Sequence, residues 1–339
     1  MNLLDRVRIP VMQGGMGVGV SLSGLAGAVA KAGGIGIISA AQIGYREAEY
    51  DMDPHGSNLK ALRQEILKAK EMAEGGIVGV NIMLVTTGYD DYVKTAVAAG
   101  ADLIVTGAGL PMNLPALVAG SEVKIAPIVS SVRATKVILA YWKKHYNRIP
   151  DLLVIEGPQA GGHLGFSKQE VLGITREEYD KEVQGIISLC TQSQIPVFVA
   201  GGIYTREDME HYRAMGAFGV QMATRFVTTY ECDAHENYKK AYLNAREEDV
   251  IITDSPVGLP GRALNNEFLK RVAKGERFMG KCRRCVMTCK PAETPYCISR
   301  ALIQAVSGNC EEGLIFVGSN VYRTKEIEHV ADIMEEFRV

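Results

Sequence analysis

A histidine in a glycine-rich stretch has the clearest chemical potential in this sequence. His163 lies in segment 156–165, which also contains four glycines and follows a run of apolar residues. A histidine at such a place can accept or donate a proton near neutral pH. The alternative is a structural histidine bonded to a carbonyl of its own loop. The remaining histidines are predicted to be surface residues in helices or polar loops: His55, His145, His211, His235 and His329.

Two later loops contain residue types that suit a phosphate group. One contains Gly201 and Gly202, and the other is segment 221–225, Gln-Met-Ala-Thr-Arg. Glycines let backbone N–H groups approach an anion closely, and a helix that begins just after such a loop favours negative charge. Thr205 is predicted to cap the helix that follows the first loop. A tight turn without a ligand is the alternative for the two glycines.

An amide side chain stands at the end of another apolar run. Asn81 lies in segment 79–83, Gly-Val-Asn-Ile-Met. An amide both donates and accepts hydrogen bonds, so it could contact a ligand that has donors and acceptors side by side. Capping of its own strand is the alternative interpretation.

Four of the seven cysteines cluster late in the chain, at Cys282, Cys285, Cys289 and Cys297. The spacing of the first pair is typical of zinc or iron–sulfur sites. The whole pattern matches no defined site, and the basic residues around it could instead lower a thiol pKa. We therefore predict no metal site and favour buried or redox-inert thiols. Cys190 is predicted to lie in the core, on a helix.

Eight short runs rich in valine and isoleucine are predicted to be strands that position these residues. They lack strict alternation and are bounded by Gly, Pro or Asp, which is typical of parallel strands buried on both faces. The predicted strands are Ile9–Gln13, Ile35–Ser39, Ile77–Met83, Leu103–Thr106, Ile125–Ser130, Leu152–Ile155, Val197–Ala200 and Gly219–Met222.

Amphipathic segments between these runs are predicted to be helices. They are Ser23–Lys31, Leu59–Met72, Tyr89–Ala99, Val132–His145, Glu177–Cys190, Arg206–Met215 and Tyr238–Ala245, with a weaker helix around Pro111–Ala119. Eight strands with intervening helices predict an α/β fold, a (β/α)8 TIM barrel. A doubly wound open sheet is the alternative. The barrel is favoured because there are eight strands and because the glycine-rich turns follow many of them rather than one.

The pattern changes after about Arg246. We expect residues 1–246 to form the barrel, 247–312 to form a cap over its mouth that contains the cysteine cluster, and 313–339 to pack back on the barrel. Segment Lys325–Phe337 is predicted to be an amphipathic helix, because Ile327, Val330 and Ile333 share one face.

The overall composition limits the classes of partner. The formal net charge is −2, so no nucleic acid or anionic membrane is expected as a partner. We expect a small-molecule substrate instead. The first ten residues contain charges and no apolar run, and no stretch of about 18 apolar residues exists, so a cytoplasmic protein is expected. An exposed barrel rim and a C-terminal helix are compatible with a homodimer.

Six motifs together resemble the nitronate monooxygenase (2-nitropropane dioxygenase) family, from residue 8 to about 246 and again from about 313. Flavin-dependent enoyl-acyl-carrier-protein reductases of the FabK type share these motifs, so the motifs do not separate the two branches. The motifs are PVMQGGM (10–16), GVNIML (79–84), TGAG (106–109), AGGHLG (160–165), AGGI (200–203) and QMATRF (221–226).

The resemblance implies a TIM barrel that binds FMN, and it places His163 at the family's catalytic histidine. Family members often have glycine at position 223, an acid at 159 and glutamine at 156, where this chain has Ala223, Gln159 and Glu156. The resemblance implies phosphate contacts from Gly201, Gly202, Ala223 and Thr224. It implies flavin-ring contacts from Met12, Gln13, Gly14, Asn81 and Gly161. Glu156 and Gln221 are two further candidates for cofactor binding.

Three functions follow as hypotheses. The first is oxidation of an alkyl nitronate or nitroalkane with O2 to a carbonyl compound and nitrite, with His163 as base. The second is an NAD(P)H-dependent flavin reductase acting on an enoyl thioester or a quinone, for which an acyl carrier protein would be a partner. The third is a non-enzymatic electron-transfer module that uses the cysteine cluster as a metal centre.

Overall fold

Eight parallel strands close into a barrel in this computed structural model, which describes residues 3–339. The first strand pairs with both the second and the last, so the sheet has no free edge. This confirms the predicted (β/α)8 barrel and excludes the open doubly wound sheet. All eight predicted strands lie within two residues of the observed bounds. The barrel strands are β1 (Val11–Gln13), β2 (Ile35–Ser39), β3 (Ile77–Asn81), β4 (Leu103–Thr106), β5 (Lys124–Val129), β6 (Leu153–Glu156), β8 (Val197–Ala200) and β9 (Gly219–Met222).

The strands are apolar on both faces because each face meets a separate core. One cluster fills the barrel interior and includes Met12, Ile37, Val105, Val154 and Phe198, all of which are buried. The larger cluster lies between the strands and the surrounding helices. Burial on both faces explains why the strand sequences do not alternate between apolar and polar residues.

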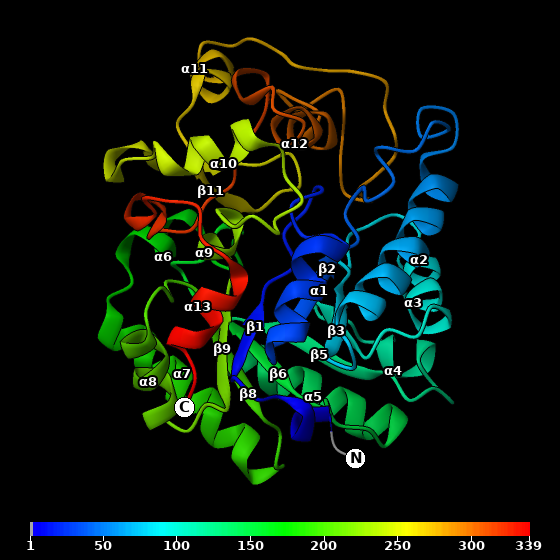
Figure 1. Ribbon diagram of the computed structural model, residues 1–339, viewed down its shortest axis with the longest axis vertical. Coiled ribbons are helices and arrows are strands. Elements are labelled where there is room, and N and C mark those ends of the chain that lie inside the picture. The colour runs from blue at the N-terminus through cyan, green and yellow to red at the C-terminus, as the bar shows by residue number, and fades with distance from the viewer. Residues whose placement is uncertain (1–2) are drawn as a thin grey trace.

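Helices follow the strands and surround the barrel (Figure 1). α2 begins earlier than predicted because the Asp53 carboxylate accepts a hydrogen bond from the Gly56 N–H and Pro54 suits a first helical turn. The predicted cap at Thr205 is confirmed, since its hydroxyl accepts a hydrogen bond from the Asp208 N–H. The helices are α1 (Ser23–Ala32), α2 (Pro54–Met72), α3 (Tyr89–Ala98), α4 (Leu114–Leu117), α5 (Val132–Tyr146), α6 (Lys168–Gly173), α7 (Arg176–Gln192), α8 (Arg206–Ala214), α9 (Thr224–Val227) and α10 (Glu236–Leu243).

A second, three-stranded sheet lies outside the barrel and was not predicted. Its strands are β10 (Val250–Asp254), β11 (Pro260–Leu264) and the two-residue β7 (Gly162–His163), in the order β10-β11-β7. β11 pairs antiparallel with β7, so that Gly261 faces His163 and Arg262 faces Gly162. The histidine is therefore attached to the segment that follows the barrel.

Residues after the barrel cover one end of the molecule. α11 (Glu267–Ala273) and α12 (Ile298–Val306) lie at the end away from the N-terminus, and the long loop between them arches across that end (Figure 1). The loop contacts the β3 side through backbone hydrogen bonds from Thr87 N–H to Cys285 O, at 3.1 Å, and from Met287 N–H to Val85 O, at 2.9 Å. We refer to residues 247–312 as the cap segment.

The last helix, α13 (Val330–Glu336), begins five residues later than predicted. The prediction was wrong for residues 325–329 because Glu328 pairs with Thr229 in a parallel bridge. Its N–H donates to Thr228 O at 3.0 Å, and its carbonyl accepts from Tyr230 N–H at 3.1 Å, so neither group can join a helix. The four 3-10 turns are Leu3–Arg6, Glu247–Asp249, Cys310–Glu312 and Val321–Arg323. Within residues 3–339, no helix has both the length and the apolar character needed to cross a membrane.

Candidate active site

The carboxyl ends of β1, β3 and β9 bring Gly14, Asn81 and Gln221 together. A Cβ atom at Gly14 would lie 3.3 Å from Gln221 Nε2, and one at Gly15 would lie 2.4 Å from the Cβ of Asn81. Within the described chain, neither the Asn81 amide nor the Gln221 amide forms a side-chain hydrogen bond. At the barrel mouth, the backbone of Gly14 and Gly15, which we call the glycine floor, therefore lies between two amides that are available to a ligand.

Met12 and Gln13, in contrast, use their side chains inside the protein. Met12 is fully buried in the barrel interior. The Gln13 amide donates to Ile37 O at 3.1 Å and accepts from Ile37 N–H at 3.1 Å, and it also donates to Gly14 O. The side chains of Met12 and Gln13 are therefore not exposed at the barrel mouth. For these two residues, only backbone groups are available to a ligand there.

His163 stands in β7, where it is contacted by Ser255 of the cap segment and by Phe316 of the C-terminal segment. Its Nε2 lies 2.7 Å from the Ser255 hydroxyl, in the loop between β10 and β11. Its ring packs edge-on against Phe316, with ring centroids 4.9 Å apart. Burial lowers the pKa of His163 to about 4, because desolvation disfavours the imidazolium. The imidazole is therefore neutral at pH 7 and able to accept a proton.

Glu156, at the end of β6, is a second titratable group in this region. Burial raises its pKa to about 7, and a hydrogen bond from the Gly165 N–H opposes the shift. Ser130 lies beside the same glycine, since a Cβ atom at Gly165 would be 2.5 Å from the Ser130 hydroxyl and 3.6 Å from the Glu156 carboxylate. Glu156 therefore changes its charge within the physiological pH range.

Replacement of Glu156 by glutamine is expected to change how stability depends on pH. The pKa of Glu156 in the folded protein lies above its unfolded value of 4.5, so folding favours the protonated form. Its contribution is fully present below pH 4.5 and is lost as pH rises to about 7. We expect Glu156→Gln to remove a loss of about 3 kcal/mol over this interval. Urea unfolding of the flavin-free protein between pH 4.5 and 8 measures this loss, with exposed Glu248→Gln as control. Parallel pH profiles for wild type and Glu156→Gln would contradict the assignment.

The predicted phosphate loops are joined by a segment that sequence reasoning missed. Gly318 N–H donates to the Thr224 hydroxyl at 3.2 Å, and the Asn320 amide donates to Gly202 O at 2.8 Å. Between them, the Ser319 hydroxyl oxygen is buried and has no hydrogen-bond partner in the described chain. Nothing in the sequence near Ser319 pointed to the two loops, which precede it by about a hundred residues.

The backbone of these loops has an irregular course that depends on glycine. Gly201 and Gly202 have φ values of +98° and +79°, in the left-handed region that glycine favours. Ala223 occupies the N-cap position of the four-residue helix α9 and forms no side-chain hydrogen bond there. Gly161 packs against the chain at 317–318, since a Cβ atom there would lie 2.6 Å from the Val317 carbonyl carbon. The glycine floor, the available amides and the unpartnered hydroxyl fit a flavin nucleotide.

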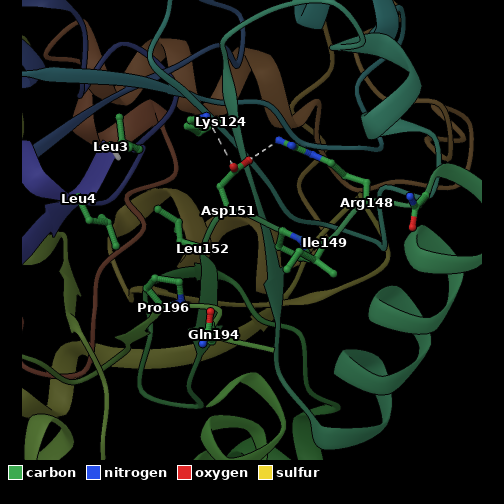
Figure 2. A pocket seen from close by; sticks show the side chains of 11 residues that line it. Leu3, Leu4, Lys124, Arg148, Ile149, Asp151, Leu152, Gln194 and Pro196 are labelled. Atoms are coloured by element: carbon green, nitrogen blue, oxygen red, sulfur yellow. Dashed lines mark hydrogen bonds and ion pairs between the residues drawn. The ribbon is translucent and has the colours of Figure 1, made fainter. Parts of the chain in front are cut away.

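The cavity in Figure 2 lies at the opposite end of the barrel. It has a volume of about 440 Å³ and is lined by residues at the amino ends of strands, including Lys124 and Pro196. Asp151 binds Arg148 at 2.7 Å and Lys124 at 3.9 Å across it. Active sites of (β/α)8 barrels lie at the carboxyl ends of the strands, so we assign no catalysis to this cavity.

The cysteines do not converge on a metal centre in the part of the chain that the structure describes. No three His, Cys, Asp or Glu side chains in residues 3–339 are placed to hold a metal ion. Cys282 is exposed, while Cys285, Cys289 and Cys297 are half-buried. The prediction that Cys190 belongs to the core is confirmed, and burial raises its pKa to about 12.

Comparison with known proteins gives one consistent result. A family model described as nitronate monooxygenase matches residues 1–338. A probable nitronate monooxygenase of Staphylococcus haemolyticus is 26% identical over 290 residues, which cover 80% of this chain and 79% of that protein. The structure of FabK from Thermotoga maritima is 28% identical, with a TM-score of 0.75 over 99% of this chain and 93% of that one. Nitroalkane oxidase from Streptomyces ansochromogenes shares the fold at 20% identity, with a TM-score of 0.75 over 99% of this chain and 96% of that one.

Proposed function

The chain belongs to the nitronate monooxygenase family of oxidoreductases, and from this we propose that it oxidises a nitroalkane or its nitronate with O2. The products are a carbonyl compound and nitrite. Two nitronate ions and one O2 give two carbonyl compounds and two nitrite ions, which balances atoms, electrons and charge. The observation that carries the proposal is the neutral imidazole of His163 beside the barrel mouth.

In this proposal His163 accepts the proton from the α-carbon of the nitroalkane. An imidazole with a low pKa is a weak base, but it meets a substrate that becomes an anion as the proton leaves. The negative charge of the nitronate raises the pKa of the neighbouring imidazole and stabilises its protonated form. Ser255, at 2.7 Å from Nε2, orients the ring for this transfer.

The cofactor that the family implies is FMN. The backbone at residues 12–14, Gly161 and the amides of Asn81 and Gln221 would hold the ring, with Glu156 nearby at the end of β6. Gly201, Gly202, Ala223 and Thr224 would hold the phosphate. When bound, FMN supplies the acceptor through which electrons pass from the organic substrate to O2. The protein contributes position, a proton acceptor and a mouth covered by the cap segment.

A second candidate function is reduction of an enoyl thioester or a quinone by NAD(P)H. The similarity to FabK over nearly the whole chain favours it. His163 would then orient the substrate or deliver a proton, and an acyl carrier protein would be a partner if the substrate were an enoyl thioester. The residues named above would hold FMN in either case, so they do not separate the two reactions.

Anaerobic stopped-flow absorbance separates the two reactions. The flavin-loaded protein is mixed with an alkyl nitronate and, in separate runs, with NADH and NADPH. We expect flavin bleaching by the nitronate and no response to either nucleotide, followed by nitrite release when O2 is admitted. Rapid bleaching by a nucleotide with no response to the nitronate would replace the first function with the second.

A further inference from the structure

A cavity of about 400 Å³ opens beside the Gly201-Gly202 turn. Its wall contains Arg262 from β11 and Ser319 and Asn320 from the segment that bridges the phosphate loops. It is the meeting point of the barrel, the cap segment and the C-terminal segment. Its polar wall differs from the apolar interior of the barrel.

Arg262 is unusual among the residues of this wall because it is a buried cation without a counter-ion. Its exposed fraction is 8%. Nη1 donates to Pro158 O at 2.7 Å and to Ala160 O at 2.6 Å. No carboxylate of residues 3–339 lies within 4.0 Å of the guanidinium. Burying a charge without an opposite charge is costly, so this position calls for an anion from outside the chain. Burial correspondingly lowers the pKa of Arg262 to about 10.

The other charged groups at the cavity leave its potential positive. Arg323 has no ion pair in the described chain and stacks on Tyr204, with its Cζ 4.4 Å from the ring centroid. Arg176 lies at the rim, 63% exposed, with Asp180 at 3.9 Å. The carboxylate of Asp208 is already used, since it accepts from Tyr204 N–H and Thr205 N–H at 2.9 Å each.

Two further features suit a tetrahedral anion. The buried Ser319 hydroxyl has no partner, and it can donate one hydrogen bond. Gly201 and Gly202, which have no side chains and left-handed φ values, let an anion approach the backbone N–H groups of their turn closely. A guanidinium anchored at one nitrogen keeps its other donors for a ligand.

We propose that Arg262 and Ser319 bind the phosphate monoester of the flavin nucleotide in this cavity. This inference rests on the proposed function, because it assumes that the chain binds FMN. It adds a charged side chain from the cap segment to the Gly201-Gly202 turn, the part of the predicted phosphate site that lines this cavity. The same guanidinium holds the carbonyls of residues 158 and 160, so phosphate binding is coupled to the loop that leads to His163.

The test compares FMN with riboflavin, which lacks the phosphate. Dissociation constants are measured by flavin fluorescence on flavin-free wild type, Arg262→Met, Arg262→Lys and Ser319→Ala. We expect Arg262→Met to weaken FMN binding by about tenfold to a hundredfold while leaving riboflavin binding unchanged, as for loss of a charge-assisted hydrogen bond. Arg262→Lys is expected to restore part of the loss, and Ser319→Ala to weaken FMN binding alone. Arg176→Met is the matched control, because it removes a paired cation from the same rim.

The outcomes are distinguishable. Equal effects on both flavins, or no effect on either, would show that Arg262 is structural and overturn the inference. If Arg262→Met does not fold, Ser319→Ala decides by the same comparison. If wild type binds neither flavin, the proposed function fails and the inference fails with it. If wild type binds both flavins equally well, no phosphate site exists and only the inference is overturned.

Discussion

Replacement of His163 by alanine is expected to lower the turnover of a neutral nitroalkane by about 10²–10⁴-fold, the usual contribution of a general base. In the proposed mechanism the imidazole is the proton acceptor, and its lowered pKa keeps it unprotonated over most of the pH range. The measurement is nitrite release under air, with the nitroalkane added in its neutral form.

Preformed nitronate is the internal control for this experiment. The nitronate has already lost its proton, so His163→Ala is expected to retain most of its turnover with that substrate. For wild type acting on the nitroalkane, kcat/KM should fall as His163 becomes protonated near pH 4. Unchanged turnover of His163→Ala with every electron donor would rule out a catalytic role.

Replacement of Arg225 by methionine is expected to cost about 3 kcal/mol of folding free energy. The Arg225 side chain is 7% exposed and binds Glu328 and Glu336, with N–O distances of 2.6 Å to each. These ion pairs join α9 to Glu328, which precedes α13, and to Glu336, which lies in α13. Urea unfolding of the flavin-free protein at pH 7 measures the loss.

The pH dependence of this loss has a definite sign. The hydrogen bond from Arg225 lowers the pKa of Glu336 below its unfolded value of 4.5. The stabilisation is therefore present above pH 4.5 and is lost as pH falls through the folded pKa, so the two proteins should converge in acid. Arg246→Met is the control, because that side chain is 67% exposed and its pairs with Glu248 and Asp249 are screened by solvent. Equal stability of Arg225→Met and wild type at pH 7 would contradict the prediction.

The barrel was predictable from the sequence because its strands have local signatures. Runs such as Ile35–Ser39 and Val197–Ala200 are apolar on both faces, and each ends in a turn that the residue types indicate. The cap sheet has no such signature. β7 has only two residues, Gly162–His163, and it becomes a strand solely through pairing with β11, about a hundred residues away.

The same reasoning explains the error at the C-terminal segment. The apolar spacing of Ile327, Val330 and Ile333 fits a helix, yet Glu328 uses its backbone groups in a bridge to the loop after α9. Local propensity favours a helix weakly, and distant hydrogen bonds override it.

The site was predictable only where its residues lie in conspicuous loops. The glycines around His163 and at 201–202 mark irregular backbone near a ligand, and the structure places both at the carboxyl end of the barrel. Ser255 and Arg262 were missed because their partners are 92 and more than a hundred positions away in the sequence. A lone serine or arginine in a turn or strand has no local feature that distinguishes a site residue from a surface residue.

The pairing of β7 with β11 also constrains how this enzyme can diversify. Segments added to a barrel usually vary freely among relatives and alter which substrates enter. Here the strand of the added segment fixes the backbone of the histidine, through the pairs Gly261 with His163 and Arg262 with Gly162 and the hydrogen bond from Leu164 N–H to Pro260 O at 2.9 Å. Insertions near residue 260 would move His163 itself. Changes in the α11–α12 loop, which has no strand paired with β7, would leave this constraint on the backbone of His163 in place.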